Sequence, residues 1–396
     1  MADSFVSFIY VDHFATTPLD QRVFDAMYPF FQQDFGNPAN DIHHIGQRAR
    51  EAVDEARDKV RRAVGCSNDS RVIFTSGATE SNNLVFRGLA ERSENRRRHV
   101  VVSSIEHKSV IEPVHWLAQH GYRTTFVPVN QAGLIDSDQV ISALADDTLL
   151  VSVMAVNNEV GTIQPLEAIG KATRSRGILL HSDASQGVGK VPINMLDFGI
   201  DFLSLSAHKI YGPKGTGALC VATADAADAI APQMLGGGQE NGMRSGTLNV
   251  PGIVGLARAI ELMQELAPDE HTTLRTLRDA LSSGLQKSID GVHVNGNLDY
   301  AVPGALNVSI DGVRSTALLA RIPNIGLSGA AACGGKSATS HVLTAMGLNR
   351  DRIGSALRFG VGRFNTLQDI ESVIQSIAAA VGWIRNQPQF GLEMSR

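Results

Sequence analysis

The sequence predicts an α/β fold in which a mostly parallel sheet lies between helices and a smaller α+β domain follows. Short, nearly continuous apolar runs alternate with amphipathic stretches through the first two thirds of the chain. The pattern changes after Pro251, where long helical periodicities take over. The length of 396 residues exceeds what one ordinary core needs and allows two domains.

Six runs rich in β-branched residues predict the strands of the larger domain, because strands buried on both faces are apolar almost throughout. They cover residues 71–75, 100–103, 124–129, 149–155, 178–183 and 202–204. Amphipathic stretches at 80–93, 109–120 and 166–176 predict the helices between them. This alternation favours parallel pairing of the strands.

The last third of the chain predicts a different arrangement, with long helices before a few further strands. The expected elements are helices at 253–266 and 274–289, a strand at 305–310, a helix near Thr316, a strand at 357–361 and a closing helix from Leu367. We expect residues 1–25 and 256–396 to form the smaller domain. Residues 26–255 are then the larger domain.

Composition and charge exclude several classes of protein. Hydrophobic residues make up 43% of the chain, charged residues 19%, and the net charge is −5. This balance is typical of a compact globular protein and provides no long-range attraction to nucleic acid or to an anionic membrane. The first residues lack the basic start and apolar core of a signal peptide, and no apolar run reaches the ~18 residues of a membrane span. We therefore expect a cytoplasmic protein.

The three cysteines, Cys66, Cys220 and Cys333, lie far apart in the sequence and form no CxxC pair. This pattern argues against a disulfide framework and against a zinc site, and we expect no bound metal. Cys220 lies in an apolar, strand-like run and is interpreted as a core residue, and Cys66 as a structural one. A sparse, odd number of thiols fits a reducing compartment, where a single thiol can carry out chemistry.

A lysine follows the last apolar run of the larger domain. Ser206, His208 and Lys209 come directly after it and precede a Gly/Pro-rich turn. A buried lysine has a lowered pKa and can form an imine with an aldehyde cofactor, while a hydroxyl and an imidazole beside it can bind a phosphate. A surface lysine in a hairpin is the alternative, and Lys214 is a rival for the same role.

Small and polar residues also follow the run at 71–75. Ser76, Gly77, Ala78 and Thr79 open a predicted helix, where backbone N–H groups can approach an anion. A well-capped helix without a ligand explains the same pattern equally well.

Three more runs end in polar residues that suit a cofactor. Asp183 can pair with a protonated ring nitrogen, with Gln186 three residues further on. His107 can stack on a flat ring or move protons, and Asn158 follows another run. Taken singly, Asp183 has an N-cap as its less favoured alternative, and a lone histidine such as His107 is more often a packed polar residue. Ligands of open α/β sheets bind at the carboxyl ends of the strands, so we expect these side chains to meet.

The motifs together resemble the class V aminotransferase group of pyridoxal-phosphate (PLP) enzymes and, within it, the cysteine desulfurases. The resemblance runs from Tyr10-Val-Asp-His-Phe-Ala-Thr-Thr-Pro18 to Arg358-Phe-Gly-Val-Gly-Arg-Phe364. It implies fold type I, with a mixed, mostly parallel seven-stranded sheet in the larger domain. It also implies that Lys209 carries the cofactor, Asp183 pairs with the pyridine nitrogen and His107 stacks on the ring.

The same resemblance assigns the remaining site residues. Asn158 and Gln186 lie along the cofactor ring, and the phosphate is held by Ala78, Thr79, Ser206 and His208. Thr247 is the residue that a second subunit sends into its neighbour's phosphate site, which implies a homodimer. Arg358 binds the substrate carboxylate, with Asn37 close by, since a guanidinium can bind a carboxylate through two hydrogen bonds.

Cys333 is what distinguishes a desulfurase from an aminotransferase in this comparison. It lies in a stretch of small residues, Ser328-Gly-Ala-Ala-Ala-Cys-Gly-Gly-Lys336, that suits a thiol carried between substrate and acceptor. Ala330-Ala331, His13 and Ala39-Asn40-Asp41 depart from the family's usual residues. We expect these departures to affect loop mobility, partner contacts and substrate preference.

The sequence hypothesis is therefore conversion of L-cysteine to L-alanine. Lys209 moves the α-proton, the Cys333 thiolate attacks the substrate sulfur, and His107 is a candidate proton acceptor. The persulfide on Cys333 would pass to an acceptor protein such as an iron–sulfur scaffold or a thiolation protein. A selenocysteine lyase, another class V PLP lyase or transferase, and a sulfur-carrier scaffold without turnover are the alternatives.

Overall fold

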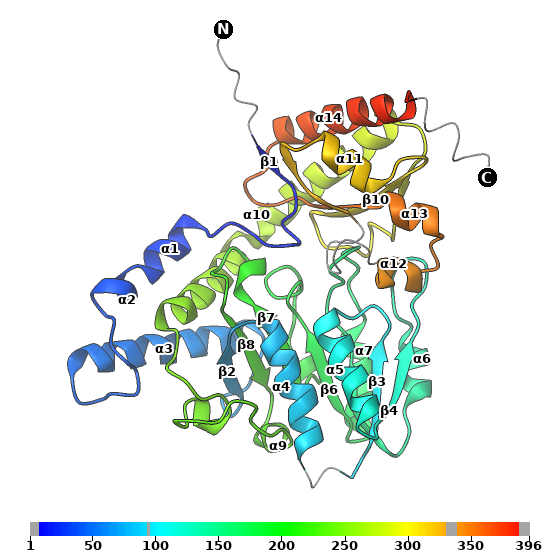
Figure 1. The fold of residues 1–396 in the computed structure, drawn as a ribbon. Coiled ribbons are helices and arrows are strands. Elements are labelled where there is room, and N and C mark those ends of the chain that lie inside the picture. Colours follow the sequence, from blue (N-terminus) through cyan, green and yellow to red (C-terminus); the bar gives the residue numbers. More distant parts are fainter. Residues whose placement is uncertain (1–7, 93–95, 330–338, 388–396) are drawn as a thin grey trace.

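The computed structural model describes residues 8–92, 96–329 and 339–387, and every structural statement below concerns this part of the chain. Its largest sheet has seven strands in the order β2-β8-β7-β6-β5-β3-β4 (Figure 1). The strands are β2 (Arg71–Thr75), β3 (His99–Ser103), β4 (Arg123–Val127), β5 (Thr148–Ser152), β6 (Leu179–Asp183), β7 (Phe202–Ser206) and β8 (Gly217–Val221). Strand β8 runs antiparallel to both of its neighbours, and the remaining pairs are parallel. This confirms the predicted mixed, mostly parallel sheet.

Alternate residues of these strands face two separate hydrophobic cores, because side chains of a strand point to opposite faces in turn. In β2, Val72 and Phe74 join one core and Ile73 joins the other. The first core is covered by α3 (His44–Ala63), α6 (Ser137–Ala143), α7 (Leu166–Ser175), α8 (Met195–Phe198) and the first half of α10 (Val250–Ser288). The second is covered by α4 (Ala78–Glu91), α5 (Lys108–Gln119) and α9 (Ala224–Asp228). Helices on both faces explain why the strands are apolar throughout.

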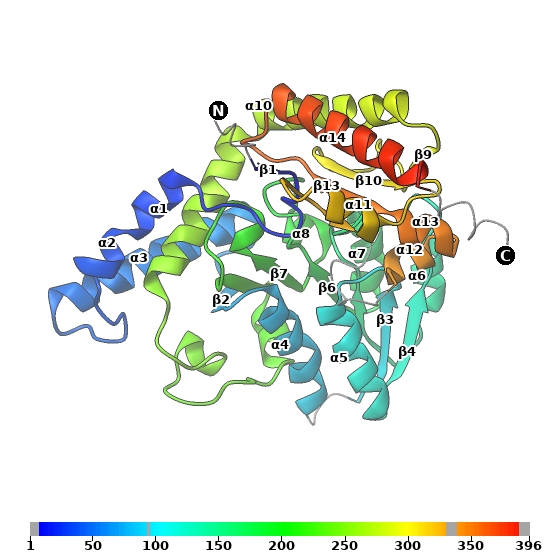
Figure 2. The ribbon, with the colours of Figure 1, turned by 45° about the horizontal axis from the view of Figure 1, so that its top comes forward.

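A smaller, antiparallel sheet lies above the large one in Figure 1. Its strand order is β12-β13-β10-β9, formed by β9 (Val292–Val294), β10 (Ala305–Ile310), β12 (Ser328–Gly329) and β13 (Leu357–Gly360). Its helices are α11 (Ser315–Arg321), α12 (His341–Ala345), α13 (Arg350–Ser355) and α14 (Leu367–Arg385). Figure 2 shows α14 beside the second half of α10, and the two helices contact each other.

The N-terminal segment reaches both parts of the structure. Strand β1 (Ile9–Tyr10) pairs in parallel with β11 (Ile325–Gly326), and Val11 joins the core of the smaller sheet. The following helices, α1 (Gln21–Met27) and α2 (Pro29–Gln32), contact α10. The predicted domain limits at residues 25 and 255 remain a prediction, since α10 runs across the second of them.

The prediction of two helices at 253–266 and 274–289 was wrong, because α10 is one helix of 39 residues that continues through Pro268. Its buried positions explain the error. The apolar stripe ends at Met263 on the larger core and resumes at Leu277 on the smaller one, with no buried residue between them. A stripe that stops and restarts looks like two helices when only periodicity is considered.

Most other boundaries agree with the prediction within a few residues. Helix α4 begins at Ala78 rather than at residue 80, because Gly77 adopts φ +150° and the helix starts directly after it. The core interpretation of Cys220 is confirmed, since its side chain is fully buried in β8. Among the described residues no helix combines the length and the apolar composition that a membrane span requires.

Candidate active site

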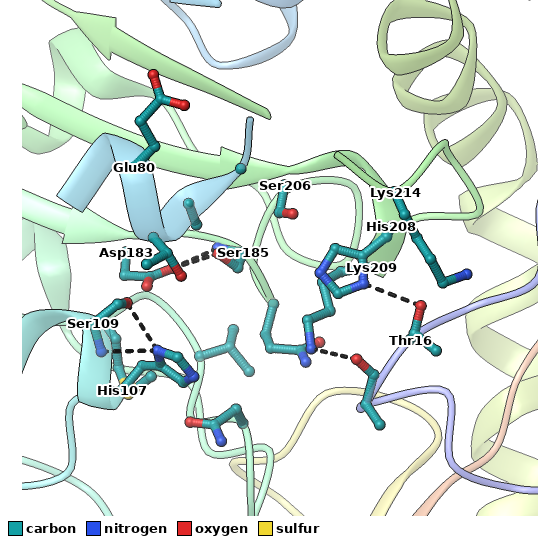
Figure 3. Close-up of a pocket in the computed structure, with 18 of the residues that line it drawn as sticks. Thr16, Glu80, His107, Ser109, Asp183, Ser185, Ser206, His208, Lys209 and Lys214 are labelled. Atoms are coloured by element: carbon teal, nitrogen blue, oxygen red, sulfur yellow. Dashed lines mark hydrogen bonds between the residues drawn. The ribbon is translucent and has the colours of Figure 1, made fainter. Parts of the chain in front are cut away.

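A cavity of about 530 Å³ lies where the polar residues follow β2, β3, β5, β6 and β7. The carboxyl ends of parallel strands meet at one edge of a sheet, so residues far apart in sequence come together there. The cavity is lined by nine of the predicted cofactor-site residues, namely Ala78, Thr79, His107, Asn158, Asp183, Gln186, Ser206, His208 and Lys209. Arg358 from β13 lines it as well. Figure 3 shows His107, Asp183 and Lys209 around this common space.

Lys209 ends a short 3₁₀ turn, Ala207–Lys209, that follows β7. Its Nζ atom donates hydrogen bonds to the carbonyl oxygens of Phe14 at 2.8 Å and Ala15 at 2.7 Å. Two backbone carbonyls from the N-terminal segment thus hold the amine at the wall of the cavity. An amine fixed in this way is available to a carbonyl group placed in the cavity.

One end of the cavity is suited to an anion. Helix α4 has 14 residues and Gly77 at its N-cap, and no side chain caps its first N–H groups. The positive end of the helix therefore faces the region lined by Ser206 and His208. A glycine suits position 77 because of its φ of +150°, which residues with a side chain rarely adopt; a Cβ there would make only an ordinary contact with Ser206 Oγ at 3.6 Å.

Burial and nearby charges keep His208 neutral around pH 7. Burial, with the positive charges of Lys209, Lys214 and Lys190, lowers the pKa of His208 to about 4. Its Nδ1 lies 3.1 Å from Thr16 Oγ1. A neutral imidazole can donate one hydrogen bond to a phosphate oxygen, and an arriving negative charge would favour its protonation.

The Asp183 carboxylate, 4% exposed, is held by three hydrogen bonds. Ser185 donates to Oδ1 from its backbone N–H at 3.0 Å and from its hydroxyl at 2.6 Å. Asn82 donates to Oδ2 at 2.8 Å from inside α4. These donors fix the orientation of the carboxylate, as a pairing with a protonated ring nitrogen requires.

The hydrogen bonds of His107 define its tautomer. The backbone N–H of Ser109 donates to His107 Nδ1 at 3.1 Å, so Nδ1 is an acceptor. Burial lowers the pKa of His107, which leaves the ring neutral with its hydrogen on Nε2. In this state Nε2 is a donor, and the role of His107 as a proton acceptor remains a prediction.

Arg358 is buried, with 5% of its surface exposed, and it lines the same cavity. Its guanidinium donates to Asp12 Oδ1 at 3.0 Å and to the Asn158 carbonyl at 3.2 Å. Nε has no hydrogen-bond partner among the described residues. A buried guanidinium with capacity left for a partner is a suitable site for a small carboxylate.

Two predicted site residues lie outside this cavity, and a third lies outside the described part of the chain. Asn37 lines a separate cavity of about 460 Å³, together with Arg57 and Glu240. Thr247 is exposed and does not line the main cavity. Cys333 lies outside the described residues, as do Ala330 and Ala331. Ser328, shortly before Cys333 in the chain, lines the cavity.

Several groups that build the site were not predicted from the sequence. Asn82 and Ser109 orient Asp183 and His107, and Thr16 contacts His208. Asn82 was visible as a polar residue at an inward position of an amphipathic helix, which is a usable signal. The Phe14 and Ala15 carbonyls carried no such signal, because every residue has a backbone carbonyl.

Comparisons with known proteins agree with this geometry. Residues 9–373 match the family described as aminotransferase class-V. The chain is 45% identical to the cysteine desulfurase IscS of Anaeromyxobacter sp. (strain Fw109-5) over 378 residues, covering 95% of this chain and 93% of that protein. A solved NifS-like protein superposes with a TM-score of 0.88 at 36% identity, covering 95% of this chain and 100% of the other. A structure of SspA in complex with cysteine gives a TM-score of 0.75 at 32% identity, with coverages of 90% and 100%.

The chain therefore belongs to the class-V aminotransferase family. Within that family, its full-length similarity to IscS assigns it to the cysteine desulfurases. Members of the family use PLP. The residues of the cavity fit this cofactor, since an uncapped helix N-terminus, a fixed carboxylate and a held lysine amine match its phosphate, its ring nitrogen and its aldehyde.

Proposed function

We propose that this chain is a PLP-dependent cysteine desulfurase that converts L-cysteine to L-alanine and carries the released sulfur on Cys333. One observation carries the proposal. Lys209, Asp183 and His107 line the same cavity, and the N-terminus of α4 lies at that cavity too. When bound, PLP supplies an electron sink for charge that develops on the substrate.

Each residue of the cavity has a defined task in this proposal. Lys209 carries the cofactor and, once released from it, moves the proton at the substrate α-carbon. Asp183 keeps the ring nitrogen protonated, and His107 packs on the ring. Ala78, Thr79, Ser206 and His208 hold the phosphate, and Asn158 and Gln186 lie along the ring. Arg358 binds the substrate carboxylate, and Ser328 and Asp12 hold its guanidinium in place.

The sulfur step uses the Cys333 thiolate as the nucleophile. Its Sγ forms a bond to the substrate sulfur while the carbon–sulfur bond breaks. The electron pair stays on the substrate β-carbon, which is then protonated to give alanine. The sum is cysteine plus thiol to alanine plus persulfide, so atoms and electrons balance without an added oxidant.

Partners and location follow from the same proposal. The persulfide passes to a sulfur-acceptor protein, such as an iron–sulfur scaffold or a thiolation protein. Thr247 reaches the phosphate site of a second copy of the chain, so the enzyme is a homodimer. Its exposure outside its own cavity supports this role. A cytoplasmic location suits a catalytic thiol that has to stay reduced.

The test is an absorbance spectrum of the purified protein before and after L-cysteine, with alanine assayed in parallel. We expect a band near ~400 nm that changes on adding cysteine, because a lysine-bound aldehyde cofactor absorbs there. Cys333→Ser should keep the band and make no alanine from cysteine. Normal alanine formation by that variant would rule out the sulfur step. A spectral change without alanine in the wild type would point to another amino acid substrate, and Cys333-independent release of selenide would favour a selenocysteine lyase.

A further inference from the structure

Lys209 also lines a second, much smaller cavity of about 30 Å³. That space is of the size of one or two water molecules. Several titratable side chains surround it, namely His13, Lys190, Lys209, Tyr211, Glu270 and His271. The proposed function gives no task to Lys190, although its amine contacts Gln186 and the ring of Phe14.

Lys190 is held in a fixed place by two contacts. Its Nζ donates a hydrogen bond to Gln186 Oε1 at 2.5 Å and lies 4.7 Å from the centre of the Phe14 ring. Gly189 precedes it with φ +76°, and a Cβ there would lie 2.7 Å from Met263 Cβ. The turn that delivers Lys190 to this position thus depends on a glycine.

The hydrogen bond from Lys190 settles the orientation of the Gln186 amide. A lysine ammonium has only donors, so the amide oxygen faces it and the amide nitrogen points the other way. That nitrogen, Nε2, donates to the Phe14 carbonyl at 2.8 Å. The same carbonyl accepts the hydrogen bond from Lys209 Nζ at 2.8 Å. Lys190, Gln186, the Phe14 carbonyl and Lys209 therefore form one continuous network.

We propose that Lys190 is a positioning residue, which orients Gln186 and the Phe14 carbonyl and so holds the Lys209 amine where the cofactor aldehyde binds. This inference rests on the proposed function, since it assumes that Lys209 and Gln186 contact PLP. Lys190 itself acts through these two residues. The amine of Lys190 also packs over the Phe14 ring. This cation–π contact helps to fix the position of Phe14, and with it the position of its carbonyl.

The charge of Lys190 makes this network sensitive to pH. Burial and the positive charge of Lys209 lower the pKa of Lys190 to about 7, while Glu270 opposes the shift. Below that pH the donor to Gln186 is an ammonium, and above it a weaker neutral amine. His13, Tyr211 and His271 face the same cavity, and burial also lowers the pKa of His13.

The experiment measures the dissociation constant of PLP from the apo-protein, by titration of the bound-cofactor absorbance at pH 6 and pH 8.5. Lys190→Met and Lys190→Gln should each weaken PLP binding about tenfold at pH 6, the effect of losing one charge-assisted hydrogen bond. The loss should be smaller at pH 8.5, where the ammonium has gone. Lys171→Met is the matched control and should leave the affinity unchanged, because Lys171 is exposed on α7 and pairs there with Glu167.

A second measurement separates positioning from general damage to the fold. Gln186→Leu removes the same hydrogen bond from its other side and should weaken PLP binding at least as much. The double variant with Lys190→Met should then lose no more than Gln186→Leu alone, since residues in one network are not additive. Independent, additive losses would overturn the proposal, and so would full PLP affinity in any folded Lys190 variant or in Gln186→Leu.

These outcomes are distinct from a failure of the proposed function. A wild-type protein that binds no PLP, or makes no alanine from cysteine, refutes the desulfurase assignment before any variant is compared. A wild type that does both, with Lys190 variants that bind PLP as tightly at both pH values, refutes only the role of Lys190.

Discussion

Replacing Arg358 with lysine tests how the substrate is held. The guanidinium of Arg358 donates to Asp12 at 3.0 Å, to the Asn158 carbonyl at 3.2 Å and to Ser328 Oγ at 3.3 Å, while Nε still lacks a partner among the described residues. A planar guanidinium can therefore keep these contacts and still present N–H groups to a carboxylate. A lysine ammonium has its three donors on one atom and cannot do both.

The expected cost is one charge-assisted hydrogen bond to the substrate, worth about 1.5–3 kcal/mol. At 1.4 kcal/mol per factor of ten, kcat/KM for cysteine should fall roughly 10- to 150-fold in Arg358→Lys. Most of the change should appear in KM, because the carboxylate is bound equally in the ground state and the transition state. PLP absorbance should stay unchanged, since the proposed role of Arg358 is to bind the substrate and not the cofactor.

Initial rates of alanine formation over a range of cysteine concentrations measure both parameters. Arg385→Lys is the matched control, because Arg385 also donates to two carbonyls, those of Asp290 and Asp311, but on the outer helix α14. A kcat/KM within twofold of wild type in Arg358→Lys would refute the carboxylate role. A drop in kcat at constant KM would refute it too, because it would assign the guanidinium to a later step.

Three further predictions follow from the same structure. Lys209→Ala should abolish the absorbance band of the bound cofactor and Lys214→Ala should retain it, since the Lys209 amine is the one held by the Phe14 and Ala15 carbonyls; the reverse result would assign the cofactor to Lys214. Arg363→Met should lower the free energy of unfolding in urea by about 3–5 kcal/mol, because it leaves the Glu270 carboxylate buried without its 2.8 Å partner. Arg22→Met removes a half-exposed partner of the buried Asp20 carboxylate, which keeps its 2.8 Å contact with Arg363; it should cost less than about 1 kcal/mol, and equal losses would contradict the reasoning. Burial raises the pKa of Asp201 to about 6, above its unfolded value of about 3.9, so its contribution to stability is present below pH 4 and lost as the pH rises through 6. Asp201→Asn should therefore gain stability relative to wild type between pH 4 and pH 7.5, on the order of 2 kcal/mol, and a pH-independent difference in urea unfolding would disprove it.

Much of the large sheet could be predicted from the sequence because its strands are buried on both faces. Runs such as Val100 to Val102 are apolar without interruption, and the residue at which the apolar run stops marks the edge of the sheet. Polar residues beyond that edge, including Asp183 and His107, could then be assigned to one site by the geometry of parallel strands. The position of each residue directly after a predicted strand was enough for this assignment, and no distance had to be known.

The smaller part was harder to predict because its elements are short and its contacts are distant in sequence. Strand β11, Ile325–Gly326, is defined by its partner β1 some three hundred residues earlier, and neither strand has enough residues for a periodic pattern. The same limit applies to Lys190, whose importance depends on Gln186 and on the Phe14 carbonyl. A residue type alone does not reveal a hydrogen bond to a main-chain atom.

The tautomer of His107 changes how the proton transfers can be divided among the residues of the site. Because Nδ1 accepts from the Ser109 backbone, the neutral ring has a hydrogen on Nε2 and no lone pair there to receive a proton. Protonation at Nδ1 would break that bond, and burial, the main cause of the lowered pKa of His107, also opposes it. A base is still needed at the substrate α-carbon, and Lys209 is the amine that the structure holds at the cavity wall. The geometry therefore favours Lys209 as the residue that accepts the α-proton, with His107 as a donor that packs on the ring.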